Sequence, residues 1–192
     1  MIISDDPSVA LRDALVRYTD AAGSGQWEAM LDMTYAARFE HTPKQELLNY
    51  LKGTEANGIR LRTASTRINE ISTPTVSGKE QFIRAETEAD QTMELIRPQL
   101  RTPEYLDRTQ AQLVAACGPD SVRFEEATNT FHFTSTQTLV GIAPEGSNDW
   151  GFLPLDSFTA EKGLVPMDIL AKWVAEKVPA KSREVKPAGA VD

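Results

Sequence analysis

The chain has 192 residues, with 20 Lys and Arg against 28 Asp and Glu and a formal net charge of −8. Its basic residues are scattered singly, which argues against the basic stripe that binds nucleic acid or an anionic membrane surface. The single cysteine, Cys117, excludes an intrachain disulfide and a thiolate metal cluster, and no apolar run approaches the roughly 20 residues that span a bilayer.

The length of the chain suffices for one hydrophobic core, so we expect a single domain over residues 1–177. Residues 178–192 offer almost nothing to bury, which predicts a disordered C-terminal tail. Residues 1–6 lack the basic region and the long apolar core of a signal peptide, which favours a cytoplasmic protein. An exported protein whose signal has been removed would have the same sequence.

The first part of the chain predicts two helices. Asp6 followed by Pro7 is typical of a helix start, and apolar residues at three- and four-residue intervals carry this helix to about Ala22. The run Gly23-Ser24-Gly25 ends it. A second, short helix follows, with one side formed by Trp27, Met30, Leu31 and Tyr35.

Two Thr-Pro pairs predict the starts of two further helices. In the first, the Thr42 hydroxyl and the Gln45 amide are spaced to satisfy each other's free backbone donors, and the helix extends to Asn57-Gly58. In the second, Thr102 precedes Pro103 and the helix ends at Gly118.

Two extended segments, 59–72 and 81–96, predict an antiparallel pair joined by a turn at 73–78. In the second segment, apolar and small residues alternate with charged ones, so one face of this strand is expected to be exposed to solvent. The charged face comprises Arg84, Glu86, Glu88, Asp90 and Glu94.

The first of these segments is expected to complement that charged face. Arg60, Arg62 and Arg67 would lie opposite the acids across the pair. The apolar alternation slips between Leu61 and Ile68, which predicts a β-bulge.

The segment 130–156 predicts two antiparallel strands around the turn-forming run 144–149, preceded by a short strand over 121–126. In the longer strand the apolar residues change parity, from Phe131 to Val140, which predicts a bulge near its middle. A closing helix is expected to bury one face, formed by Ile169, Leu170, Trp173 and Val174.

The expected order is therefore three helices, two strands, a helix, three strands and a closing helix. Segregated helices and antiparallel strands are typical of an α+β fold in which the helices cover one side of a bent sheet.

The first two predicted helices and the run Gly23-Ser24-Gly25-Gln26-Trp27 at their junction resemble the opening of the nuclear transport factor two-like superfamily, which includes ketosteroid-isomerase-like enzymes. The stretch from Asn148 to Leu153 also suits its strands, and the order of elements matches over roughly residues 7 to 157. The resemblance implies a cystatin-like roll, in which a cone-shaped, curved antiparallel sheet is covered on its concave face by the N-terminal helices. It also implies a small ligand in the mouth of the cone and a homodimer through the sheet.

In the isomerase-like branch of this superfamily, a Tyr on the first helix donates a hydrogen bond to the developing oxyanion, and Tyr18 stands at the matching place. The catalytic carboxylate lies in a Glu-Asp-Pro context, whereas this chain has Glu40-His41-Thr42-Pro43, so Thr42 replaces the base. A hydroxyl of ordinary pKa cannot deprotonate a carbon acid at neutral pH as a carboxylate in an apolar pocket does. This departure disfavours that specific chemistry.

The candidate ligand-binding residues are Tyr18, Trp27, Tyr35, Phe39, His41 and Trp150. These rings either line an apolar pocket or fill the core between helices and sheet. The first hypothesis is a non-catalytic domain that binds a small apolar molecule or a protein partner. The second is a small isomerase- or dehydratase-like enzyme that uses Tyr18 with His41 or Glu40. Neither hypothesis includes a cofactor or a metal, because the sequence has no metal-ligand spacing and no phosphate-binding glycine loop.

Overall fold

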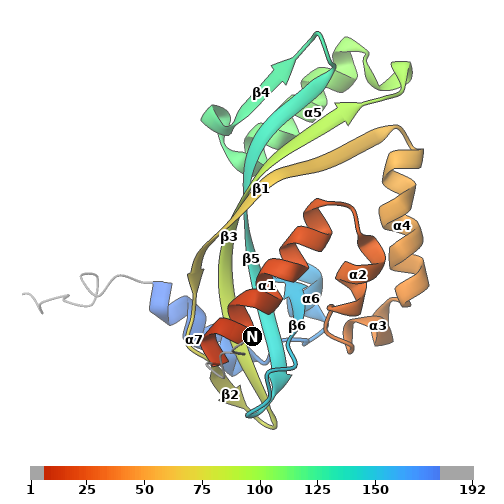
Figure 1. Ribbon diagram of the computed structural model, residues 1–192. Helices are drawn as coiled ribbons and strands as arrows, with labels where there is room; N and C mark the ends of the chain where they lie inside the picture. Colours follow the sequence, from red (N-terminus) through yellow and green to blue (C-terminus); the bar gives the residue numbers. More distant parts are fainter. Residues whose placement is uncertain (1–6, 178–192) are drawn as a thin grey trace, which may run out of the picture.

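A curled antiparallel sheet with helices around it forms the α+β fold of this protein (Figure 1). The computed structural model describes residues 7–177. The strands are β1 (Ile59–Ile71), β2 (Thr75–Ser77), β3 (Glu80–Leu95), β4 (Val122–Glu125), β5 (Thr130–Pro144) and β6 (Gly151–Pro154). The helices are α1 (Pro7–Gly23), α2 (Trp27–Asp32), α3 (Arg38–His41), α4 (Lys44–Ala56), α5 (Pro103–Cys117), α6 (Ser157–Glu161) and α7 (Met167–Lys177), with short 3₁₀ turns η1 (Pro98–Leu100) and η2 (Pro119–Ser121). The expected tail at 178–192 and the expected cap at Asp6 lie outside the described residues.

The sheet has the strand order β1-β3-β5-β4, with β2 also paired to β3 and β6 also paired to β5. This confirms the two antiparallel pairs that the sequence predicts, β1 with β3 and β5 with β6. The bulge expected in β1 is confirmed by a register shift between Thr63 and Ser65, and a second shift follows between Ile68 and Glu70. The bulge expected in β5 is wrong, because β3 and β5 pair without a shift from Glu80–Pro144 to Glu94–Thr130.

The parity change in β5 has a different cause, because two hydrophobic clusters lie on opposite faces of the same part of the sheet. Along β5, Leu139 faces one cluster and Val140 the other, so both are buried without any break in the pairing. The first cluster packs α1 on the sheet through Leu11, Ala14, Leu15, Tyr18, Ile83, Ala85, Leu139, Ala143, Trp150 and Phe152. The second packs α7 and the residues before it on the sheet through Phe82, Val140, Ile142, Leu153, Leu164, Val165, Ile169 and Trp173.

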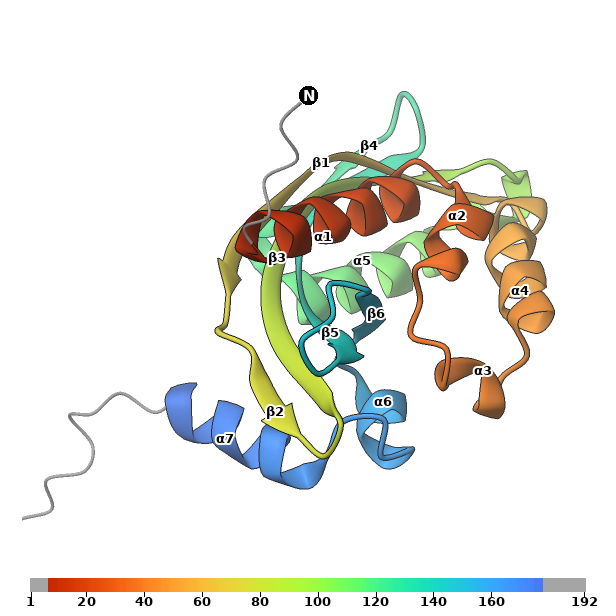
Figure 2. The same cartoon turned by 60° about the horizontal axis from the view of Figure 1, so that its bottom comes forward.

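The closing helix α7 therefore covers a part of the sheet that the sequence predicts to be exposed. It lies beside β2, where Ser77 donates to Asp168 at 3.2 Å and Lys172 donates to Thr75 at 2.9 Å (Figure 2). Arg84, expected on the exposed face of β3, is only 6% exposed, and its guanidinium donates to the carbonyl oxygen of Trp173 at 3.3 Å. The prediction failed for Arg84 because the pattern of β3 alone carries no information about a helix that is distant in the sequence.

The two Thr-Pro pairs behave differently. Thr102 caps α5, since its hydroxyl accepts a hydrogen bond from the backbone N–H of Tyr105. Thr42 does not cap α4, which begins at Lys44 after Pro43 and has no side-chain cap. Thr42 instead ends the short helix α3 and accepts a hydrogen bond from Arg38 at 3.3 Å. The predicted capping box at Thr42 is therefore wrong.

The segment between α2 and α3 is fixed against β6 rather than left as a loop. Thr34 bridges to Phe152 in parallel, and the backbone N–H of Phe152 donates to Met33 at 2.9 Å. Gly151 permits this approach, because a Cβ atom there would lie 2.7 Å from the Cα atom of Tyr35. Through this contact the sheet holds the short helices α2 and α3 in place.

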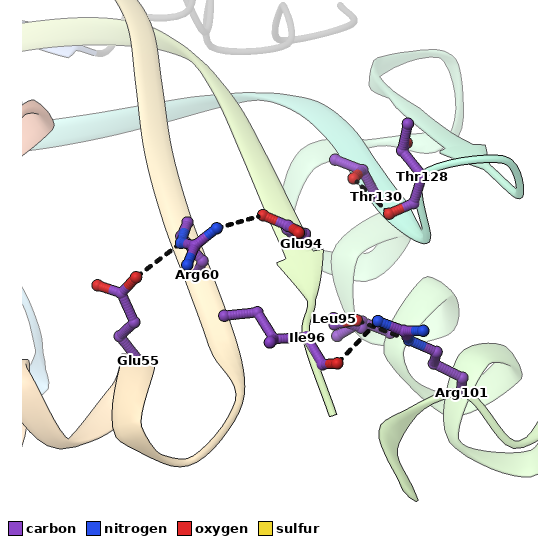
Figure 3. A network of polar contacts seen from close by, with 8 residues as sticks. All are labelled: Glu55, Arg60, Glu94, Leu95, Ile96, Arg101, Thr128 and Thr130. Carbon is purple, nitrogen blue, oxygen red and sulfur yellow. Dashed lines mark hydrogen bonds and ion pairs between the residues drawn. The ribbon is translucent and has the colours of Figure 1, made fainter. Parts of the chain in front are cut away.

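The opposite end of the sheet is held by two arginines (Figure 3). Arg60 at the start of β1 donates to Glu55 of α4 at 2.6 Å and to Glu94 of β3 at 3.0 Å. Arg101 donates to the carbonyl oxygens of Leu95 and Ile96 at 2.8 and 2.7 Å. The predicted pairing of β1 arginines with β3 acids is thus confirmed at Arg60 with Glu94 and at Arg67 with Glu88.

Candidate functional site

The structure places two of the predicted site residues, Tyr18 and Trp27, at a hollow between the end of α1 and the sheet. The hollow measures about 200 Å³. Its other walls come from the middle of β1, β3 and β5, and its polar lining includes Thr63, Thr66, Thr87, Gln91, Ser135 and Gln137.

Tyr18 is buried at this hollow, with its ring centre 5.3 Å from that of Phe152. Burial raises the pKa of its phenol to about 12, and a hydrogen bond with the side chain of Thr34 opposes this shift. The phenol is therefore neutral at physiological pH, and it can donate or accept a hydrogen bond but cannot act as a base.

No other titratable side chain among the described residues lines this hollow. Its polar groups largely bond to one another, since Ser135 donates to Gln91 at 2.9 Å and Thr87 donates to the carbonyl oxygen of Gln137 at 3.0 Å. General acid–base catalysis needs a proton acceptor within hydrogen-bond reach of the reacting group. The lining residues of the hollow do not provide one.

The predicted partners of Tyr18 lie elsewhere. His41 and Glu40 are exposed on α3, and the His41 ring packs edge-on to Phe158 with their centres 6.1 Å apart. Phe158 also stacks under the guanidinium of Arg38, whose central carbon is 3.5 Å from the ring centre. The structure thus brings His41 into a surface cluster with α6 and does not bring it into the lining of the hollow with Tyr18.

Tyr35 and Phe39 also lie away from the lining of the hollow. The Tyr35 hydroxyl donates to the carboxylate of Glu80 at 2.6 Å, which ties the segment after α2 to the start of β3. Burial and this hydrogen bond raise the pKa of Tyr35. Phe39 is half-buried on α3. Tyr35 also packs against the second hydrophobic cluster, as the core-filling alternative predicts for this ring.

Trp150, the remaining predicted residue, lines a larger groove at the other end of α1. The groove measures about 810 Å³ and lies between the start of α1, the end of β1 and the loop from β5 to β6. Its apolar lining comprises Val9, Leu11, Ile68, Ile71, Pro74 and Trp150, and its polar lining includes Arg12, Asn69, Glu70, Ser72, Gln81 and Asn148.

Several polar groups of the groove are fixed by the fold. Gln81 donates to the carbonyl oxygen of Ser147 at 2.6 Å, which fastens the β5–β6 loop to β3. Ser72 accepts the backbone N–H of Arg84 at 2.9 Å. Glu70 lies 3.8 Å from the guanidinium of the buried Arg84. The walls of the groove are therefore held by hydrogen bonds and an ion pair before any ligand arrives.

Trp150 and Arg12 differ in how their donors are placed. Trp150 is 8% exposed, and its indole Nε1–H is buried and has no acceptor among residues 7–177. The Arg12 guanidinium is exposed and makes no ion pair or hydrogen bond with a described residue. A buried N–H without an acceptor costs about 1–3 kcal/mol, so the indole N–H of Trp150 lowers the stability of this region.

Sequence reasoning found Trp150 but missed the rest of the groove. Its walls are three segments far apart in the chain, and only the pairing of β1 and β5 with β3 places them together. The turns predicted at 73–78 and 144–149 were the available signal, because residues of both runs line the groove.

Among the described residues, no group of His, Cys, Asp and Glu side chains could hold a metal ion. Every helix between residues 7 and 177 is too short or too polar to cross a membrane. Comparison with protein-family models gave no match to this chain, and comparison with curated proteins gave no significant match.

Proposed function

We propose that this protein is a non-catalytic binding domain of the nuclear transport factor two-like type, which takes a small, mainly apolar molecule into the groove beside Trp150. The observation that carries the proposal is the groove itself, with a volume of about 810 Å³ and an apolar lining that includes Trp150.

The dimensions of the groove support ligand binding. Small-molecule sites typically measure about 300–1,000 Å³ and combine apolar walls with a few fixed polar groups. The groove lies within that range, whereas the hollow at Tyr18 measures about 200 Å³ and has polar groups that bond to each other. The larger site therefore offers more apolar contact.

The pre-formed walls also support this function. Gln81 and Ser147 hold the loop, and Leu11 and Ile71 belong to or pack against the core cluster under α1. A site that is fixed before binding loses little conformational entropy when the ligand enters. The curled antiparallel sheet agrees with the cone-shaped roll of the superfamily, and we propose that the N-terminal helices cover its concave face.

A matched pair of helix variants tests the proposal. Val9 and Val16 lie on α1, about two turns apart, and are exposed to similar extents, 41% and 38%. Only Val9 lines the groove. The neutral fluorescent probe N-phenyl-1-naphthylamine is titrated into the unmodified protein and into Val9→Trp and Val16→Trp.

We expect saturable fluorescence enhancement with the unmodified protein and with Val16→Trp. Val9→Trp should reduce the affinity at least tenfold, because the indole occupies part of the groove. Circular dichroism and the thermal midpoint of each variant show that it remains folded. Equal affinity of the two folded variants, or no saturable binding to the unmodified protein, would contradict the proposal.

A further inference from the structure

We infer that the ligand of this groove is a small carboxylic acid, with its apolar body against Ile68, Ile71 and Trp150 and its carboxylate at Arg12. This inference rests on the proposed function, because it assigns a ligand class to the same groove. It follows from the charges and hydrogen-bond donors of the lining residues.

The first argument is the hydrogen-bonding character of Arg12. This residue lines the groove and makes no ion pair with a described residue, and its guanidinium donates only. A ligand that brings oxygen acceptors complements it, whereas an amine would add further donors. The side chains of Asn69 and Asn148 can do either and do not alter this preference.

The second argument is the distribution of charge. The titratable lining residues are Arg12 and Glu70. Glu70 has a cation 3.8 Å away in Arg84, which is buried behind it and also lies 3.5 Å from Glu86. Arg12 has no acid within ion-pair distance among the described residues. Of the two charged lining residues, Arg12 is therefore the one without an ion pair among residues 7–177.

The third argument is the form of the Arg12 side chain. A guanidinium binds a carboxylate through two parallel N–H donors, a geometry that an ammonium group cannot offer. Arg12 follows the buried Leu11 on α1, so the cation stands beside the apolar wall. An acid with an apolar chain can contact both at once.

Three ligands that share one apolar chain test the inference: decanoate, decanol and decylamine, each used to displace N-phenyl-1-naphthylamine at neutral pH and below its micelle-forming concentration. We expect decanoate to bind about tenfold more tightly than decanol, because a charge-assisted hydrogen bond contributes about that much to affinity. Decylamine should bind most weakly.

Arg12→Gln should remove the preference for decanoate and leave the affinity for decanol unchanged. Arg17→Gln changes another exposed arginine of α1 that does not line the groove, and it should bind all three as the unmodified protein does.

The outcomes separate the two proposals. If decanol binds as tightly as decanoate, or if Arg12→Gln and Arg17→Gln behave alike, the acid preference is wrong while the groove remains a binding site. If none of the three displaces the probe, both proposals fail. Restoration of the preference by Arg12→Lys would support a charge contact, and its loss together with intact decanol binding would support the two-donor geometry of the guanidinium.

Discussion

Phe82 and Ile83 are consecutive residues of β3, yet each is fully buried in a different hydrophobic cluster. Phe82 packs with Trp173 and Ile169 of α7, and Ile83 packs with the residues of α1 on the other face. One end of the sheet therefore lies between two helices. This arrangement fixes the floor of the proposed ligand groove, since the cluster under α1 contains Leu11 and Trp150.

The two buried side chains should contribute separately to stability. Phe82→Ala should lower the free energy of unfolding by about 3–5 kcal/mol and Ile83→Ala by about 2–5 kcal/mol, because each change leaves a cavity in a packed core. Val76→Ala, at a side chain that is 50% exposed, should change it by less than about 0.5 kcal/mol. Urea denaturation measures all three. A loss below about 1 kcal/mol at either buried position would show that the corresponding cluster is not packed as described.

Arg84 should be the arginine of β3 and β1 that matters most for stability. Its guanidinium is buried against Glu70, Glu86 and the carbonyl oxygen of Trp173. Arg84→Gln should lower the free energy of unfolding by about 1–3 kcal/mol, because it removes the guanidinium donors that these oxygen atoms accept from. Arg67→Gln breaks an exposed pair with Glu88 and should cost less than about 1 kcal/mol. Equal effects of the two changes in urea denaturation would contradict the burial of Arg84 under α7.

Alkaline pH should destabilise the protein through Tyr18. The phenol has its ordinary pKa of 10.0 in the unfolded chain and a pKa of about 12 in the folded protein. Below pH 10 it is neutral in both states, so its contribution is complete there. Between these two values the unfolded state releases a proton that the folded state keeps, so the free energy of unfolding falls by about 1.4 kcal/mol per pH unit.

Tyr18→Phe isolates this contribution. The variant has no phenol proton at this position, so its stability should fall less steeply than that of the unmodified protein as the pH rises from 10 to 12. Tyr35, whose pKa is also raised, is present in both proteins and cancels in the comparison. Parallel stability curves over this range would mean that the folded protein does not hold the Tyr18 phenol in its neutral form.

The two Thr-Pro pairs give a prediction that distinguishes sequence pattern from structure. Thr102→Ala should lower the free energy of unfolding by about 1 kcal/mol, because it removes the hydroxyl that accepts from Tyr105. Thr42→Ala should cost less than about 0.5 kcal/mol, since its hydroxyl caps no helix and receives one bond from Arg38. Thermal unfolding of both variants measures these effects. A larger loss of stability for Thr42→Ala than for Thr102→Ala would indicate that Thr42 does cap α4.

Local patterns in the sequence predicted the fold as far as local physics determines it. The break at Gly23-Ser24-Gly25 and the cap at Thr102 each depend on neighbouring residues, and each agrees with the structure. The alternation expected in β3 fails over residues 82–85, which are all buried. The bulge expected in β5 and the exposure expected for Arg84 both failed for one reason. Each depends on α7, which packs on the sheet from a distant position in the chain.

The candidate site was less predictable, because side chains of similar character have different surroundings. Tyr18, Trp27 and Trp150 reach concave surfaces, whereas Tyr35 bonds to Glu80 and His41 packs on Phe158. Composition cannot separate these cases, since an aromatic ring at helical spacing fits a core and a pocket equally well. The pairing of β1 and β5 with β3 decides which rings meet.

The central claim is that a small apolar molecule binds in the groove beside Trp150, and the indole N–H resonances of the three tryptophans test it most directly. Trp150 lines the groove, Trp27 lines the hollow at Tyr18, and Trp173 of α7 is buried against the sheet. The three signals are assigned with single Trp→Phe variants and followed by two-dimensional NMR while decanol is added. We predict that the Trp150 signal moves and saturates while the Trp27 and Trp173 signals stay in place. Movement of the Trp27 signal with an unchanged Trp150 signal would place the ligand in the hollow, and three unchanged signals would contradict binding at this groove.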